Sequence, residues 1–84
     1  MEGSRTVQIK FFAILREQAG VSSLSWRTAC TSADTLYAEL QQRFPNLKLP
    51  IVMLRVSLNE RYVDKGAEIR DGDRIVFIPP VAGG

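Results

Sequence analysis

The residues whose types and spacing could support chemistry lie at the carboxyl end, in the run Pro79-Pro80-Val81-Ala82-Gly83-Gly84. With Gly84 as the last residue, we expect its α-carboxylate to lie at the tip of a narrow tail. Gly83 and Gly84 lack a Cβ, so they can enter a slot that is too narrow for other residues. The two prolines cannot donate hydrogen bonds to a sheet, and we expect them to hold the base of the tail away from the domain. From Pro79 onward the tail reaches roughly 20 Å when fully extended, far enough to carry a carboxylate into a partner protein.

The rest of the composition limits which chemistry the chain can perform by itself. The sequence contains no histidine and a single cysteine, Cys30. A nucleophile activated by histidine, a histidine general base and most zinc sites are therefore excluded. One cysteine can form neither an internal disulfide nor a metal site, and we expect Cys30 to be a small buried or half-buried residue.

Length and charge favour one soluble domain, residues 1–84, with a flexible start at residues 1–5 and a functional tail at residues 79–84. The chain has 84 residues, of which 45% are hydrophobic, and a formal net charge of +2. Its basic residues are scattered among the acids, so we expect no nucleic-acid partner. No apolar run is long enough to span a membrane and the polar N-terminus lacks the core of a signal peptide, so we expect a cytoplasmic protein without a membrane partner.

The first half of the chain predicts two strands followed by the main helix. Residues 6–12 alternate, with Val7, Ile9 and Phe11 on the core face and Gln8, Lys10 and Phe12 on the opposite face. Residues 13–19 suit a short helix capped by Gly20, and residues 21–29 suit a second strand with Leu24, Trp26 and Thr28 on one face. We expect the side chain of Thr31 or Ser32 to cap the main helix, and Asp34 to suit its positive end. This helix should bury Leu36, Tyr37, Leu40 and Phe44 and end at Pro45.

The second half predicts three further strands separated by tight turns. Residues 53–58 suit a strand with Leu54, Val56 and Leu58 inward, and Asn59-Glu60 suits a turn into a short return strand at residues 61–63. Residues 65–66 and 71–73 read as turns before the last strand, residues 74–78, whose Ile75 and Phe77 face inward.

This order of elements predicts an α+β fold in which one main helix covers one face of a mixed sheet of about five strands. A late strand beside the first strand would bury both apolar rows under the helix. That arrangement is the ubiquitin-like β-grasp, here with a flexible C-terminal tail.

The uncovered face of such a sheet should be polar, and this sequence departs from that pattern. Phe12, Val76 and Ile78 point outward on two strands that we expect to be neighbours, and Tyr62 can join them. An apolar patch next to a reaching tail indicates a site for a partner protein.

Several short motifs together resemble a known family. They are Phe11-Phe12-Ala13, Arg16-Glu17, Gly20, Asp71-Gly72-Asp73 and the Pro-Pro-Val-Ala-Gly-Gly end. From Val7 to Gly84 the chain resembles the small, sulfur-carrier subunit of molybdopterin synthase. Position 78 departs slightly from the family, because relatives also carry an aromatic residue where this chain has Ile78.

The resemblance implies a reaction sequence in which partner proteins supply the catalysis. An ATP-using, ubiquitin-activating-like adenylyltransferase converts the Gly84 carboxylate to an acyl-adenylate, and sulfur then replaces AMP to give a thiocarboxylate. The tail enters the large synthase subunit, where two such sulfurs build the dithiolene of molybdopterin from cyclic pyranopterin monophosphate. The carrier would bind no cofactor or metal and would act only within a hetero-oligomer, for which we expect a heterotetramer.

Site residues follow from the same resemblance by position. Gly84 would carry the sulfur. Tail threading would involve Gly83, Ala82, Val81, Pro80 and Pro79. The interface with the large subunit would include Phe12, Ile78, Val76, Tyr62 and Asn59.

Three alternatives remain open at this stage. The sulfur carrier of thiamine synthesis shares the fold and the Gly-Gly end, although the Phe-Phe-Ala motif and the Pro-Pro pair favour the molybdopterin role. A ubiquitin-like modifier would instead be joined to protein lysines. A docking module would tolerate a blocked or extended C-terminus, which would abolish both the carrier and the modifier roles.

Overall fold

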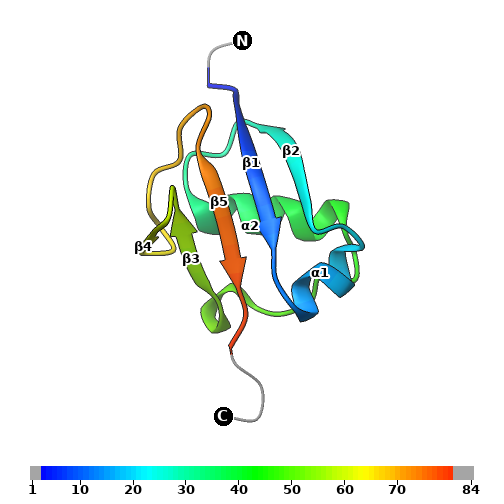
Figure 1. Cartoon of the computed structure of the whole chain (residues 1–84). Coiled ribbons are helices and arrows are strands. Elements are labelled where there is room, and N and C mark those ends of the chain that lie inside the picture. Colours follow the sequence, from blue (N-terminus) through cyan, green and yellow to red (C-terminus); the bar gives the residue numbers. More distant parts are fainter. Residues whose placement is uncertain (1–2, 81–84) are drawn as a thin grey trace.

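The computed structural model describes residues 3–80, which form one sheet and two α-helices (Figure 1). The elements in chain order are β1 (Arg5–Phe11), α1 (Ile14–Ala19), β2 (Ser23–Thr28), α2 (Ala33–Arg43), the 3-10 turn η1 (Ile51–Met53), β3 (Arg55–Leu58), β4 (Arg61–Val63) and β5 (Arg74–Ile78). Helices and strands follow the predicted order, with an additional short turn before β3.

The sheet has five strands in the order β2-β1-β5-β3-β4. The strand β1 pairs antiparallel with β2 and parallel with β5, and β3 lies antiparallel between β5 and β4. The last strand therefore lies beside the first, as predicted. Because β1 and β5 run in the same direction, the chain leaves β5 at the end of the sheet where β1 passes into α1 (Figure 1).

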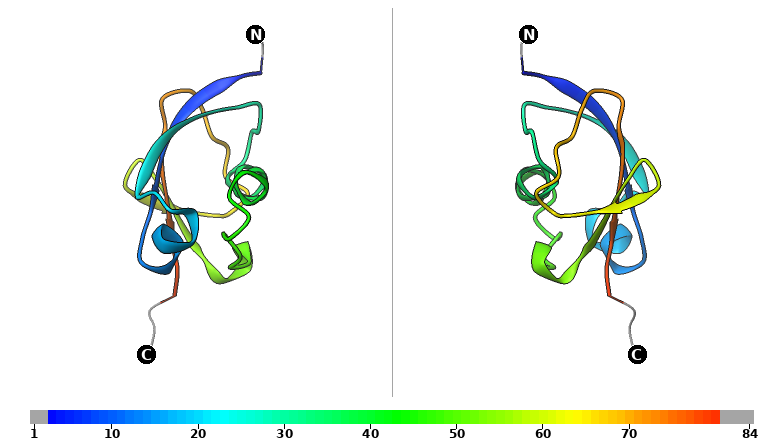
Figure 2. Two further views of the ribbon diagram at one scale, coloured as in Figure 1. Left: turned by 90° about the vertical axis from the view of Figure 1, so that its right-hand side faces the viewer. Right: turned by 90° about the vertical axis from the view of Figure 1, so that its left-hand side faces the viewer.

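One face of the sheet is covered by α2, which lies to one side of the strands in both views of Figure 2. The helix buries Leu36, Tyr37 and Leu40 against the inward side chains of the strands. The fully buried strand residues are Val7, Ile9, Phe11, Val56, Ile75 and Phe77. This single core confirms the predicted strand phase and the α+β architecture, and it leaves the opposite face of the sheet open.

The first residues of α2 are capped differently from the prediction. Neither the Thr31 nor the Ser32 side chain accepts a bond from a free helix N–H; the Ser32 hydroxyl donates to Asp34 Oδ1 at 2.6 Å instead. The N–H groups of Ala33 and Asp34 donate to the carbonyl oxygens of Ala67 and Lys65, at 3.2 and 2.8 Å. A loop distant in sequence therefore supplies the acceptors that we expected from local side chains.

Asp34 supplies the remaining acceptor at this helix start. Its Oδ1 accepts the N–H of Thr35 at 2.7 Å. The Ser32 hydroxyl, followed by the Thr35 N–H, lowers the pKa of the Asp34 carboxyl, because both donors favour its ionised form.

Three strands differ in their bounds from those predicted, and β2 spans Ser23–Thr28 instead of residues 21–29. The strand β1 begins at Arg5 and ends at Phe11, so Phe12 follows the strand instead of closing it. Met53 belongs to η1, where its N–H donates to the Pro50 carbonyl at 3.0 Å. Arg55 already pairs with Ile78, the last residue of β5, so Met53 has no neighbouring strand with which to continue the sheet.

Candidate functional site

The open face of the sheet carries one continuous row of outward residues across all five strands. From β2 to β4 the row is Ser23, Lys10, Val76, Ser57 and Tyr62, each paired with the next. A neighbouring row on the side away from the tail consists of Ser25, Gln8 and Arg74. On the side of the tail, Ile78 pairs with Arg55. Apolar side chains are therefore concentrated in the half of the face from which the chain leaves β5.

The structure brings the predicted apolar residues to this half of the face. Phe12 is 40% exposed and Tyr62 is 68% exposed. Val76 and Ile78, which lie between them on the central strand β5, are half-buried. The four side chains, called the apolar patch below, were singled out because of their outward phase, and the pairing of β1, β5, β3 and β4 makes them neighbours.

The four residues of the apolar patch line two shallow hollows, two residues in each. One, of about 370 Å³, includes Phe12, Val76, Lys10 and Arg74 in its lining. The other, of about 480 Å³, is lined by Met53, Arg55, Tyr62, Ile78, Pro79 and Pro80. The second hollow is thus continuous with the base of the tail.

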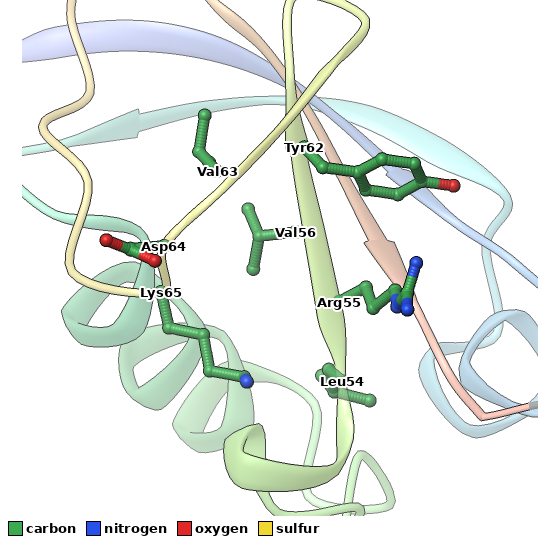
Figure 3. Close-up of a pocket in the computed structure, with 7 residues that line it drawn as sticks. All are labelled: Leu54, Arg55, Val56, Tyr62, Val63, Asp64 and Lys65. Atoms are coloured by element: carbon green, nitrogen blue, oxygen red, sulfur yellow. The ribbon is translucent and has the colours of Figure 1, made fainter.

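A cation lies over each exposed aromatic ring of the patch. Lys10 Nζ is 5.2 Å from the centre of the Phe12 ring, and Arg55 Cζ is 5.3 Å from the centre of the Tyr62 ring. Figure 3 shows Arg55 and Tyr62 on the same side of β3, directed away from Val56 and from the helix. Both separations lie within the range of cation–π attraction, so each cation helps to hold the ring beneath it.

Asn59 holds the turn between β3 and β4 against the start of β5. Its side-chain amide donates to Asp73 Oδ1, and its Oδ1 accepts the N–H of Arg74, both at 2.9 Å. Asn59 and Glu60 have φ angles of 52° and 73°, which confirms the predicted tight turn. Because its polar atoms are engaged within the chain, Asn59 contributes to the site mainly by positioning β4 and Tyr62.

The base of the tail differs from the prediction. Pro79 is buried, whereas Pro80 is exposed. Pro79 therefore packs on the domain instead of holding the tail away from it, because its apolar ring completes the hollow formed by Met53, Tyr62 and Ile78. Val81, Ala82, Gly83 and Gly84 lie outside the described residues.

Some exposed apolar residues next to the patch were not found from the sequence. Met53 is 48% exposed and lines the hollow at the tail base. Ile14, the first residue of α1, and Val21, which follows that helix, are also exposed. The sequence predicts a strand from residue 53 onward, and its alternation gives no indication that Met53 lines a surface hollow. The signal that was missed is Pro50, which starts a 3-10 turn and lifts the following apolar side chains out of the sheet.

A further hollow of about 310 Å³ lies at the edge formed by β3 and β4, and Figure 3 shows the residues that line it: Leu54, Arg55, Val56, Tyr62, Val63, Asp64 and Lys65. Within residues 3–80, no group of three or more His, Cys, Asp or Glu side chains could hold a metal ion. No helix in the same range is long and apolar enough to cross a membrane. The arrangement that does stand out is an apolar centre with charged surroundings beside Pro79 and Pro80, and protein interfaces share this anatomy.

Comparison with known proteins assigns the fold class first. The ubiquitin of Caldiarchaeum subterraneum superposes with a TM-score of 0.62 at 19% identity, covering 98% of this chain and 100% of that chain. The fold is therefore the ubiquitin-like β-grasp. The sequence model of the ThiS family matches residues 9–84, so the chain belongs to the ThiS family.

Several relatives and solved structures with similar sequences carry names from molybdopterin synthesis. The molybdopterin synthase sulfur carrier subunit of Aedes aegypti is 36% identical, over 93% of this chain and 88% of that protein. A putative molybdopterin converting factor subunit 1 from Pyrococcus furiosus has a TM-score of 0.77 at 27% identity, covering 92% of this chain and 99% of that chain. A chain in the complex of subunits 1 and 2 of the Helicobacter pylori molybdopterin-converting factor has a TM-score of 0.61 at 26% identity, covering 94% and 99%. These likenesses confirm the resemblance drawn from the motifs.

Proposed function

We propose that this chain is the sulfur carrier subunit of a molybdopterin synthase. The Gly84 carboxylate would be converted to an acyl-adenylate and then to a thiocarboxylate, which donates its sulfur to cyclic pyranopterin monophosphate inside the synthase. The proposal is supported by the relatives that carry this name and by the match over most of the chain.

The observation that carries the proposal is the position of the apolar patch on the sheet. The patch occupies the half of the open face from which the chain leaves β5, and the hollow formed by Tyr62 and Ile78 extends to Pro79 and Pro80. A partner that binds this half of the face is therefore already beside the root of the tail. A partner that docks on the domain would therefore position the tail in the same step. This suits a protein that delivers a chemical group on its C-terminal residue.

The chemistry suits a carrier without catalytic side chains of its own. A carboxylate is a poor electrophile, and transfer of AMP to it creates a good leaving group that an incoming sulfur nucleophile can displace. The thiocarboxylate that results is a soft nucleophile and is ionised at neutral pH. The activating adenylyltransferase would supply the ATP site and the large subunit would supply the pterin site, so the carrier would need no bound cofactor.

The large subunit of the synthase is the partner that we propose for the open face. The Helicobacter pylori neighbour forms a complex between subunit 1 and subunit 2, and this chain resembles one member of that complex over 94% of its length. In the proposed complex the apolar patch is covered by the large subunit while the tail reaches the pterin.

The proposal is tested by the mass of the protein isolated from its native cells. A thiocarboxylate replaces one oxygen by sulfur and adds about 16 mass units to the intact chain. Incubation of that form with the large subunit and cyclic pyranopterin monophosphate should restore the original mass and form molybdopterin. A chain that never gains this mass, or that delivers its sulfur only to a thiamine precursor, would overturn the proposal.

A C-terminal extension provides a matched control. One alanine added after Gly84 should abolish adenylation and sulfur transfer, because the activated carboxylate would no longer belong to glycine. The domain should be unaffected, since the core of the described residues is built from side chains at or before Phe77. Full synthase activity from the extended chain would show that the tail performs no chemistry.

A further inference from the structure

The strands place charges of one sign on the open face of the sheet. The outward positions of the five strands include four cations, Lys10, Arg27, Arg55 and Arg74, and all four are exposed. The other outward positions are Thr6, Gln8, Ser23, Ser25, Ser57, Tyr62, Val76 and Ile78, so the strands place no acid on this face. The chain as a whole has eleven basic and nine acidic residues. The sequence is therefore nearly balanced in charge, whereas the strands of the folded chain present only cations on the open face.

The acids in the described part of the chain lie on the helices and in the turns: Glu17 on α1, Asp34 and Glu39 on α2, and Glu60, Asp64, Glu68, Asp71 and Asp73 in the connecting segments. Glu60, in the turn between β3 and β4, is the one acid that lines the hollow shared with Lys10 and Arg74. Asp73 is occupied by the Asn59 amide and the Arg70 N–H. Within residues 3–80, the one ion pair closer than 4.0 Å joins Arg70 to Glu68, so none of the four cations on the face is neutralised by a direct ion pair there.

We propose that the partner protein presents Asp and Glu side chains around an apolar centre, opposite the four cations of the open face. This inference rests on the proposed function and assigns the acidic surface to the large subunit of the synthase. Attraction between the two surfaces would accelerate association and set the orientation in which the tail arrives, since interfacial charge affects rate and register more than affinity.

Two of the cations are held in place before binding. Lys10 lies over Phe12 and Arg55 lies over Tyr62, on opposite sides of the central residues Val76 and Ile78. A side chain that is already restrained loses less conformational entropy when it meets a carboxylate. Arg27 and Arg74 extend the positive field toward the far end of the sheet.

A protein fits this face better than a nucleic acid does. Single strands bind on aromatic rings whose faces are free to stack on bases, with cations along the backbone. Here a cation lies over each exposed ring, and the centre of the face is aliphatic. An aliphatic centre with charged surroundings is the anatomy of a protein interface.

The test measures association of the full chain with the purified large subunit at several salt concentrations. The face variant is Lys10→Gln/Arg74→Gln, and the control is Lys48→Gln/Arg70→Gln, which removes the same charge away from the open face. We expect the face variant to associate about tenfold more slowly at about 50 mM salt, with the difference shrinking as salt screens the charges. The control should match the parent chain at every salt concentration.

Each other outcome overturns the proposal in a recognisable way. Association that does not depend on salt, with the face variant equal to the control, would refute the acidic partner surface while leaving the proposed function intact. Failure of the parent chain to bind the large subunit would refute both. Binding of fluorescein-labelled oligo-dT by the parent chain, lost in the face variant, would assign the face to nucleic acid instead.

Discussion

Phe11 and Phe12 are adjacent in sequence and differ completely in their surroundings. Phe11 is 1% exposed, and its ring centre lies 6.2 Å from that of Phe77 and 6.4 Å from that of Phe44. Phe12 is 40% exposed and contacts Lys10 on the open face. One residue of strand phase thus separates a core position from a proposed binding position.

We predict that Phe11→Ala and Phe12→Ser have separate effects. Phe11→Ala should lower the free energy of unfolding by about 3–5 kcal/mol, because it leaves a cavity in the core. Phe12→Ser should change stability little and weaken binding to the large subunit. Urea unfolding and a titration with the large subunit measure the two effects. Equal destabilisation by both substitutions would contradict the phase of β1.

Tyr37 provides a test at alkaline pH. Its side chain is buried under the sheet, and its hydroxyl donates to the Leu49 carbonyl at 2.7 Å. Burial raises the pKa of Tyr37 from 10.0 to about 12, because the phenolate cannot be solvated there. The unfolded chain loses this proton at lower pH than the folded chain does.

We therefore predict that the contribution of Tyr37 to stability is intact below pH 10.0 and is lost as the pH rises toward about 12. The loss should be roughly 2–3 kcal/mol. Urea unfolding across this range should show a steep fall for the parent chain and a shallower one for Tyr37→Phe. Tyr62→Phe, which changes an exposed ring, is the control. An unchanged slope in Tyr37→Phe would show that another group is responsible.

At the scale of elements, the sheet depends on contacts between segments distant in sequence. The turn after β3 is tied to the start of β5 by Asn59, and the start of α2 is capped by the loop at residues 65–67. The turn before β5 is tied to β1, because the Thr6 N–H donates to Asp71 Oδ1 and the Gly72 N–H donates to the Thr6 carbonyl. These polar links hold β3, β5 and β1 in register.

We predict that Asn59→Gly and Asn59→Ala destabilise the chain by different amounts. Both remove the hydrogen bonds to Asp73 and Arg74, at a cost of about 1–2 kcal/mol. Alanine should cost about 1 kcal/mol more, because the φ angle of 52° is unfavourable for a residue with a Cβ. Urea unfolding measures both variants. Stability of Asn59→Gly equal to that of the parent chain would show that the side-chain bonds add nothing.

At the scale of the whole molecule, a β-grasp domain presents the tail from one end of its open face. Among residues 3–80 the core ends at Phe77, so we expect substitutions beyond Pro80 to leave the domain unaffected.

We predict that Gly83→Ala slows activation or sulfur transfer and that Gly83→Val slows it more, because in the proposed mechanism a side chain there would have to pass a narrow channel in each partner. Melting temperatures should match the parent chain within about 2 °C. Adenylate formation and single-turnover transfer from a preformed thiocarboxylate measure the two steps. If the valine variant retains both rates, the tail is not threaded and the docking-module interpretation becomes the better one.

The sequence by itself determined the local structure and the phase of the side chains. Alternation placed Val7, Ile9 and Phe11 in the core and left Phe12 outside, and helical spacing did the same for Leu36 and Leu40. Gly20, with a φ of 81°, caps α1 as its residue type required. These features depend on residues within one turn or one strand of each other, so a linear pattern carries them. The presence of an apolar patch and its members followed from the same phase.

Only the tertiary structure decided what depends on where distant segments meet. The carbonyl groups that cap α2 and the burial of Pro79 both depend on neighbours supplied by other parts of the fold. The positive face is the clearest case, since its cations are scattered along the chain and come together only through the pairing of β2, β1, β5 and β3. A linear pattern shows which way each side chain points. Strand order and register, set by long-range hydrogen bonds and core packing, determine which side chains share a surface.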